Sequence, residues 1–183
     1  MADAAVLLAA GASRRLGRPK QLEEIHGEAL IHRAARLALE AGFSPVLVVL
    51  GHGADRVGKA LEDLAVQAVH NPGWEEGMAS SIRAGVSALP PEAESVLLLV
   101  CDQLALARGL LETFRAVHAG SPGLTLASAY EGGLGVPALF PRARFPELMG
   151  LRGDRGAKGL LEDGALGIPF PGGERDLDLP GPD

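Results

Sequence analysis

Two short stretches of the sequence carry the residues best suited to chemistry. The first, "LLAAGASRRLGRPKQL" at residues 7–22, runs from an apolar segment through Gly11 into a loop with four cations, Arg14, Arg15, Arg18 and Lys20. Glycine lets the backbone approach a ligand closely, and exposed N–H groups beside cationic side chains can form an anion site. The loop has neither GxxxxGK[ST] nor GxGxxG spacing, so an exposed basic turn without a ligand explains it as well as a phosphate site does.

The second stretch is "VCDQLAL" at residues 100–106, in which Asp102 directly follows the most apolar run of the chain. A carboxylate at the end of a buried strand is suited to Mg²⁺, which usually binds through one or two carboxylates together with substrate phosphates. The alternative is that Asp102 caps a helix over 106–119. Cys101 is expected to be a small buried side chain.

Three other motifs have structural explanations. "GHGAD" at 51–55 lacks the third glycine of a dinucleotide fingerprint, because Arg56 stands there, and it indicates an ordinary strand-to-helix turn. Ser80 and Ser81 of "NPGWEEGMASSIRAG" at 71–85 stand near the start of a helix, where they would either cap it or reach a ligand. Capping also explains Asp154 of "LRGDRGAKGLL" at 151–161.

The elements that position these residues follow an alternating strand and helix pattern. Apolar runs predict strands at 4–10, 46–50, 66–69, 95–101 and 124–129, and amphipathic segments predict helices at 29–41, 55–64, 78–88, 106–119 and 155–163. "GGLGVPALFP" is expected to be a glycine-rich loop that leads into a strand. The pattern predicts a three-layer α/β fold with a mostly parallel sheet, whose ligands bind at the carboxyl ends of the strands.

Composition limits the function further. With 183 residues and 47% hydrophobic content, the chain 1–183 is expected to form one domain. A net charge of -6, one Trp and one Tyr disfavour nucleic-acid binding. Neither a basic leader nor an apolar run of the ~20 residues needed to cross a bilayer is evident, so we expect a cytoplasmic protein without a membrane partner, monomeric by default. The five histidines and Cys101 show no zinc spacing.

Taken in order, these motifs resemble the MobA-like nucleotidyltransferases, and most closely their molybdenum cofactor cytidylyltransferase branch. "LAAGASRRLGRPKQL" is similar to the family signature LAAG-x-S-x-R-M-G-x-x-K, with Leu16 in place of Met. "NPGWEEGMASSIRAG", "CDQL", "GGLGVPALF", "LRGDRGAKGLL" and "DLDLP" follow in the family's order, so the resemblance covers almost the whole chain. It implies a Rossmann-like nucleotidyltransferase fold.

The resemblance also implies a reaction, in which a nucleoside monophosphate passes from an NTP to a phosphate of a molybdopterin-type acceptor and pyrophosphate is released. Mg²⁺ would be the cofactor, and a molybdoenzyme or its chaperone a protein partner. The catalytic residues would be Arg15, Lys20 and Asp102. The nucleotide would bind at Leu8, Ala9, Ala10, Gly11, Ser13, Arg15, Gly17, Lys20, Gly77, Ser81 and Asp102, the acceptor at Gly135, Pro137, Gly153, Asp154 and Lys158, and the metal at Asp102 and Asp178.

Several alternatives stay open. LAAG and the G-V-P-A-L-F block favour CTP over GTP, while "DQL" and "DLDLP" depart from the DQP and DIDTP of the family, which makes Asp178 a weaker metal ligand than Asp102. Relatives that make CDP-methylerythritol or sugar nucleotides carry different blocks on the acceptor side. Outside this class, an NAD(P)-linked oxidoreductase would need the fingerprint that Arg56 interrupts, and a non-catalytic accessory protein would not need both Lys20 and Asp102.

Overall fold

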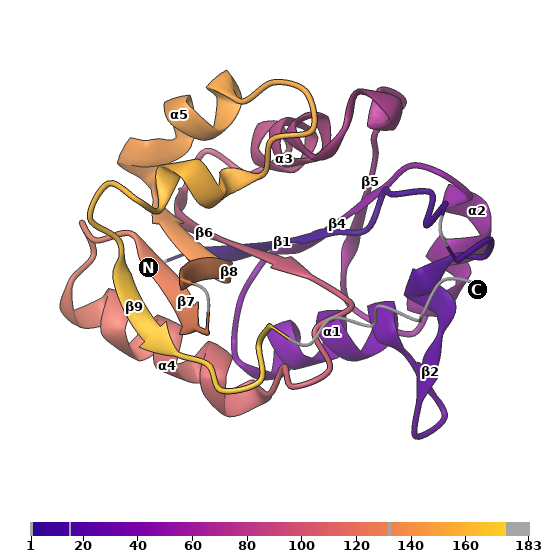
Figure 1. The fold of residues 1–183 in the computed structure, drawn as a ribbon, viewed down its shortest axis with the longest axis horizontal. Coiled ribbons are helices and arrows are strands. Elements are labelled where there is room, and N and C mark those ends of the chain that lie inside the picture. The colour runs from indigo at the N-terminus through magenta and orange to yellow at the C-terminus, as the bar shows by residue number, and fades with distance from the viewer. Residues whose placement is uncertain (1, 15, 132, 175–183) are drawn as a thin grey trace.

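The computed structural model describes residues 2–14, 16–131 and 133–174, and its centre is a seven-stranded sheet (Figure 1). The strand order is β5-β4-β1-β6-β8-β7-β9. Every neighbouring pair is parallel except those that β8 makes with β6 and β7. The strands are β1 (Ala2–Leu8), β4 (Val46–Leu50), β5 (Gln67–His70), β6 (Ala93–Val100), β7 (Leu126–Tyr130), β8 (Gly133–Pro141) and β9 (Leu166–Pro169).

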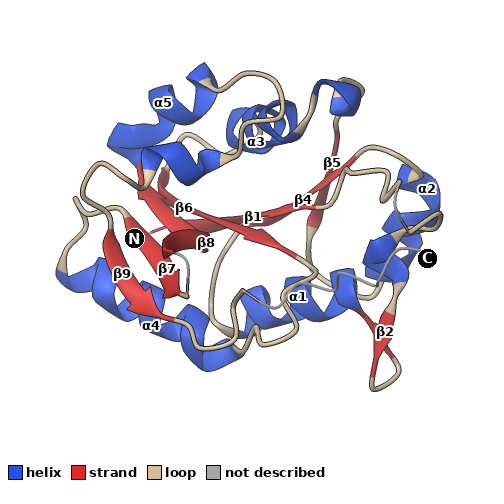
Figure 2. Cartoon of the chain, viewed as in Figure 1, coloured by secondary structure: helices blue, strands red, loops and turns tan. Residues whose placement is uncertain are grey.

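Helices cover both faces of this sheet (Figure 2). On one face lie α1 (Leu30–Glu40) and α4 (Arg108–Gly120), and on the other lie α3 (Met78–Ser87) and α5 (Phe145–Gly150). Alternate residues of β1 explain the two layers, because Ala5 and Leu7 belong to one apolar cluster and Val6 to the other. Burial on both sides accounts for the unbroken apolar strands. The predicted three-layer α/β fold with a mostly parallel sheet is confirmed.

Some predicted elements are wrong in length or type. The helix predicted at 55–64 is a short α2 (Ala54–Gly58) followed by a 3-10 turn, and the one predicted at 155–163 is a 3-10 turn at Ala157–Leu160. Most of the glycine-rich segment expected to be a loop belongs to β8, because pairing with β6 and β7 on both sides overrides the weak strand preference of glycine.

Other elements are too short to show a period in the sequence. They are the six-residue α5, the four-residue β9 and a hairpin of β2 (Glu24–Ile25) and β3 (Glu28–Ala29). No helix among the described residues is long and apolar enough to cross a membrane.

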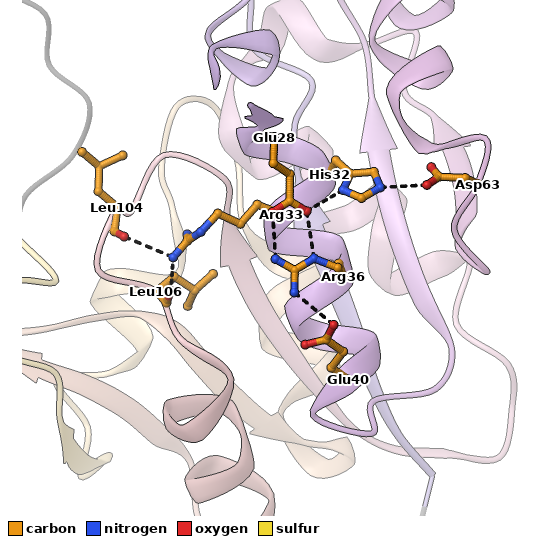
Figure 3. A network of polar contacts seen from close by, with 8 residues as sticks. All are labelled: Glu28, His32, Arg33, Arg36, Glu40, Asp63, Leu104 and Leu106. Carbon is orange, nitrogen blue, oxygen red and sulfur yellow. Dashed lines mark hydrogen bonds and ion pairs between the residues drawn. The ribbon is translucent and has the colours of Figure 1, made fainter. Parts of the chain in front are cut away.

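A network of polar contacts fixes α1 to its surroundings (Figure 3). Arg36 donates two hydrogen bonds of 2.8 Å to Glu28 and one of 3.0 Å to Glu40. His32 contacts Glu28 at 2.6 Å and Asp63 at 3.1 Å. Arg33 leaves the helix on another side and donates to the carbonyls of 104 and 106, which connects α1 to the loop that follows β6.

This network predicts a pH-dependent stability. The hydrogen bonds from Arg36, assisted by His32, lower the pKa of Glu28 from 4.5 to about 2, although burial opposes the shift. A carboxylate with a lowered pKa stabilises the fold fully above pH 4.5 and ceases to do so as the pH falls towards 2. We therefore expect Glu28→Gln to reduce the free energy of unfolding by about 1 kcal/mol at pH 7, and by progressively less below pH 4.5.

Urea denaturation of the variant and the wild type at pH 7, 4 and 3 measures this difference. Glu62→Gln, at an exposed glutamate just after the neighbouring 3-10 turn, is the control and should change stability little at any of these pH values. A loss that is equal at all three pH values would show that the Glu28 charge is not its cause.

Candidate active site

A cavity of about 600 Å³ opens at the carboxyl ends of β1 and β6. Four parts of the chain form its walls: the end of β1 with the loop after it, the 3-10 turn Lys20–Leu22, the start of α3 with the turn before it, and the residues after β6. Asp154 joins them from the loop at 151–156. Lining residues are Leu8, Ala9, Ala10, Gly11, Ala12, Ser13, Arg14, Lys20, Gln21, Trp74, Glu75, Glu76, Gly77, Met78, Ser81, Val100, Cys101, Asp102 and Asp154.

The two principal candidates for catalysis meet in this cavity. Lys20 Nζ lies 2.6 Å from Asp102 Oδ2, and each side chain is only about one fifth exposed. Helix α4 begins with Ala107 at its N-cap and shows no side-chain cap bond, so the interpretation of Asp102 as a cap is wrong. Burial raises the pKa of the Cys101 thiol to about 12, which leaves a neutral thiol in the wall, as expected of a small buried side chain.

The cationic loop is held in shape by a buried side chain, Gln21. Its Nε2 donates at 2.9 Å to the carbonyl oxygens of both Ala9 and Gly11, just beyond the end of β1. The Ser13 hydroxyl accepts a hydrogen bond of 3.1 Å from the Lys20 backbone N–H. These bonds satisfy carbonyls that have left the sheet and fix the point from which the Lys20 side chain begins.

Around this loop the other residues of the motif take separate positions. Gly17 closes a turn with φ of 68° and does not line the cavity, whereas Arg14 does. Arg18 is bound to Glu23 by an ion pair of 2.6 Å outside the cavity. Arg15 lies outside the described residues, as does Asp178.

On the opposite wall, Asn71 organises the start of α3. Its amide donates to the hydroxyls of Ser80 and Ser81 at 2.9 and 3.1 Å, and its carbonyl oxygen accepts from the backbone of Gly73. Neither serine caps the helix, because the N-cap is Gly77 and the Ser80 hydroxyl donates to the Gly77 carbonyl oxygen at 2.9 Å instead of accepting from a backbone N–H of the first turn. The interpretation of the serines as caps is therefore wrong, and Ser81 lies in the cavity wall.

The loop 151–154 is clamped against the start of α3. A Cβ at Gly77 would lie 2.6 Å from Asp154 Cα and 2.8 Å from the Gly153 carbonyl oxygen. Glu76 accepts hydrogen bonds from Arg83 and from the Gly153 backbone, and these lower its pKa from 4.5 to about 2. Asp154 Oδ1 accepts from the Met78 backbone N–H at 3.4 Å, so the carboxylate faces the N-terminus of α3 instead of capping the segment after it.

The remaining acceptor candidates lie away from the cavity. Gly135 and Pro137 belong to β8, and a Cβ at Gly135 would overlap Tyr130 Oη, so glycine at this position leaves room for the Tyr130 ring. Lys158 is exposed in the 3-10 turn Ala157–Leu160. Of the predicted acceptor residues within the described ranges, Asp154 alone lines the cavity.

The site residues that sequence reasoning missed are mostly polar and buried. The chain contains only three Gln and one Asn, and Gln21, Gln103 and Asn71 are all buried beside the motifs of the site. Gln103 donates to the carbonyls of Val136 and Gly173, which connects the loop after β6 to β8 and to the C-terminal segment. The scarcity of amide side chains is the signal that could have found them. Trp74, also missed, lines the cavity and packs edge-on to His52.

Comparisons with known proteins show which family the chain matches. Residues 5–167 match the family described as "MobA-like NTP transferase domain". The chain is 30% identical over 175 residues to the purine catabolism protein PucB of Bacillus subtilis strain 168, a match that covers 88% of this chain and 82% of PucB. It is 36% identical over 126 residues to nicotine blue oxidoreductase of Paenarthrobacter nicotinovorans, covering 68% of this chain and 60% of that protein.

Solved structures show the same relationship. The crystal structure of Rv0371c from Mycobacterium tuberculosis H37Rv superimposes with a TM-score of 0.83 at 30% identity, over 98% of this chain and 93% of that one. A structure of Rv0371c in complex with manganese has a TM-score of 0.75 at 27% identity, over 93% and 89% of the two chains. The chain therefore belongs to the MobA-like NTP transferase family.

Proposed function

We propose that the protein transfers CMP from CTP to a phosphate of a molybdopterin-type acceptor and releases pyrophosphate. The observation that carries this proposal is the convergence of Lys20 and Asp102, which come from two distant loops, in one cavity at the ends of β1 and β6. An ammonium and a carboxylate there can serve a triphosphate and its metal ion, as phosphoryl transfer requires. A protein that only carried a nucleotide or cofactor would not need both.

In the proposed reaction an oxygen of the acceptor phosphate attacks the α-phosphorus of the nucleotide. The bond from the α-phosphorus to the oxygen that bridges to the β-phosphate breaks, and pyrophosphate leaves with that bonding pair. The attacking phosphate is already ionised, so the chain needs no covalent intermediate and no strong base. Its contribution is positioning and charge stabilisation. The proposed cations for the phosphates are Lys20 and Arg15, and Arg14, at a variable position of the family signature, also lines the cavity. The exposed Gly11 leaves its backbone open to the phosphates.

The residues present fit a divalent metal that arrives with a nucleotide. No group of three or more His, Cys, Asp or Glu side chains within the described ranges could hold a metal ion. Asp102 therefore needs phosphate oxygens as partners, which is the usual way in which Mg²⁺ binds. We propose Mg²⁺ as the ion, and the manganese complex of Rv0371c supports a divalent metal. Such an ion neutralises charge on the phosphates, and Asp178 is the proposed second ligand.

The sequence blocks support the choice of base and acceptor. Through the family resemblance, LAAG and "GGLGVPALF" favour CTP over GTP. We propose that the acceptor binds beside Asp154, which lines the cavity. Gly135, Pro137, Gly153 and Lys158 do not line it, and the resemblance alone supports a role for them. The test includes an arm for the oxidoreductase alternative because one relative is named nicotine blue oxidoreductase.

The test is a substrate panel with the purified protein. CTP, GTP, ATP and UTP are each incubated with Mg²⁺ and a molybdopterin-type acceptor, and released pyrophosphate is measured. We expect release with CTP, dependent on both metal and acceptor. Release with GTP instead of CTP would show that the protein transfers GMP. No release with any nucleotide would overturn the proposal that the protein is a nucleotidyltransferase for this acceptor. In a parallel thermal-shift series, stabilisation by NADPH alone would favour the oxidoreductase, because a ligand stabilises the folded state that binds it.

A further inference from the structure

The ion pair between Lys20 and Asp102 has a consequence for how a metal enters the site. We propose that the Lys20 ammonium keeps a divalent metal from binding Asp102 when no nucleotide is present. When a triphosphate arrives with the metal, the ammonium moves to a phosphate and leaves the carboxylate free to bind the metal. The inference rests on the proposed function, since it concerns the same Asp102. It adds a second role for Lys20, in which the residue couples metal binding to nucleotide binding.

The first support is the geometry of the pair. Lys20 Nζ and Asp102 Oδ2 are 2.6 Å apart, so a metal ion bound at that oxygen and the ammonium cannot share the position. Each side chain is about one fifth exposed. Partial burial strengthens the attraction beyond that of a pair in open solvent, and a metal must break it to bind.

The second support is the way in which the chain holds the base of the Lys20 side chain. The Lys20 backbone N–H is bound to the Ser13 hydroxyl, and Gln21 is bound to the carbonyls of Ala9 and Gly11. The backbone is thereby fixed, while the long Lys20 side chain rotates about several bonds. The ammonium can therefore turn from the carboxylate to a phosphate in the same cavity without movement of the loop.

The third support is the charge that the metal would meet. With Lys20 on Asp102, the pair is close to neutral and attracts a metal ion only weakly. Within the described ranges, no group of three or more His, Cys, Asp or Glu side chains offers the metal another site. A triphosphate brings several negative charges into the cavity and gives the ammonium a new partner. Metal and nucleotide should therefore raise each other's affinity, and coupling between two ligands is reciprocal.

The test measures Mn²⁺ binding by electron paramagnetic resonance, so that its result does not depend on turnover. Without nucleotide, Lys20→Met should bind Mn²⁺ at least about tenfold more tightly than the wild type, a coupling of ordinary size. Lys20→Arg keeps a cation on Asp102 and should bind as weakly as the wild type. Lys59→Met removes a lysine outside the cavity and is the matched control for net charge. Adding CTP should raise the affinity of the wild type for Mn²⁺ by more than it raises that of Lys20→Met.

Each outcome decides the proposal. The blocking role is wrong if the wild type and Lys20→Met bind Mn²⁺ equally without nucleotide. It is also wrong if the affinity of Lys59→Met for Mn²⁺ rises as much as that of Lys20→Met. Both conclusions hold whatever the substrate panel shows. If the gain of Lys20→Met disappears in the double variant Lys20→Met/Asp102→Asn, the metal is held at Asp102, as proposed. If the gain survives in the double variant, the metal binds elsewhere and the proposal fails. Circular dichroism of each variant establishes that it is folded.

Discussion

Replacing Asp102 with Asn is expected to lower kcat for pyrophosphate release by at least about a thousandfold, which corresponds to about 4 kcal/mol of activation free energy. The side chain keeps its shape but loses the charge that would hold the metal. In the structure this carboxylate has an ion pair with Lys20 at the cavity wall. Because the pair is partly exposed, its loss should reduce the free energy of unfolding by only about 1 kcal/mol. Activity should therefore disappear from a protein that remains folded.

The measurement is steady-state pyrophosphate release at saturating Mg²⁺, together with a urea denaturation curve for the same preparation. Glu75→Gln is the matched control, because it removes one negative charge from the same cavity without touching the Lys20–Asp102 pair. We expect that variant to retain activity within about tenfold of the wild type, a change of about 1.4 kcal/mol. Full activity in Asp102→Asn would show that the metal is held by other residues.

The part of the site that the sequence predicts well is the part placed by the sheet. β1 and β6 are neighbours and their apolar runs end at Leu8 and Val100, so the residues that follow both strands meet at one edge. The pattern of strands is therefore enough to predict that Gly11 and Asp102 lie at the ligand-binding edge of the sheet. The order of the motifs, through the family resemblance, predicts Lys20 and Ser81 there as well.

The parts that the sequence does not predict depend on contacts between distant segments. Gln21 is important because the carbonyls of Ala9 and Gly11 lie beyond the last strand pair and need donors, which no local pattern reveals. Asp154 is a similar case, since its position predicts a cap for the segment after it, whereas its carboxylate faces the start of α3. Short elements such as β9 take their conformation from the neighbour they pair with, and four residues carry too little pattern to predict that.

Gly77→Ala is expected to cause the largest loss of stability among single substitutions near the cavity. Gly77 has φ of 119°, a conformation that costs a residue with a side chain about 1–3 kcal/mol. The added Cβ would also lie within 2.9 Å of the Asp154 backbone N and closer still to the Gly153 carbonyl oxygen. These are backbone atoms that cannot rotate away, so overpacking should add about 1–3 kcal/mol.

Gly133→Ala separates the two effects. Gly133 has nearly the same φ, 120°, but a Cβ there meets no atom within 4 Å, so this variant should suffer the conformational cost alone. Urea denaturation of both variants gives the cost of the close approach as their difference. Equal losses would show that the loop 153–154 moves freely away from α3. If the clamp is rigid, as the bonds of Glu76 to Arg83 and Gly153 indicate, Gly77→Ala should also raise KM for the acceptor, because Asp154 is displaced from the cavity wall, whereas Gly133→Ala should not.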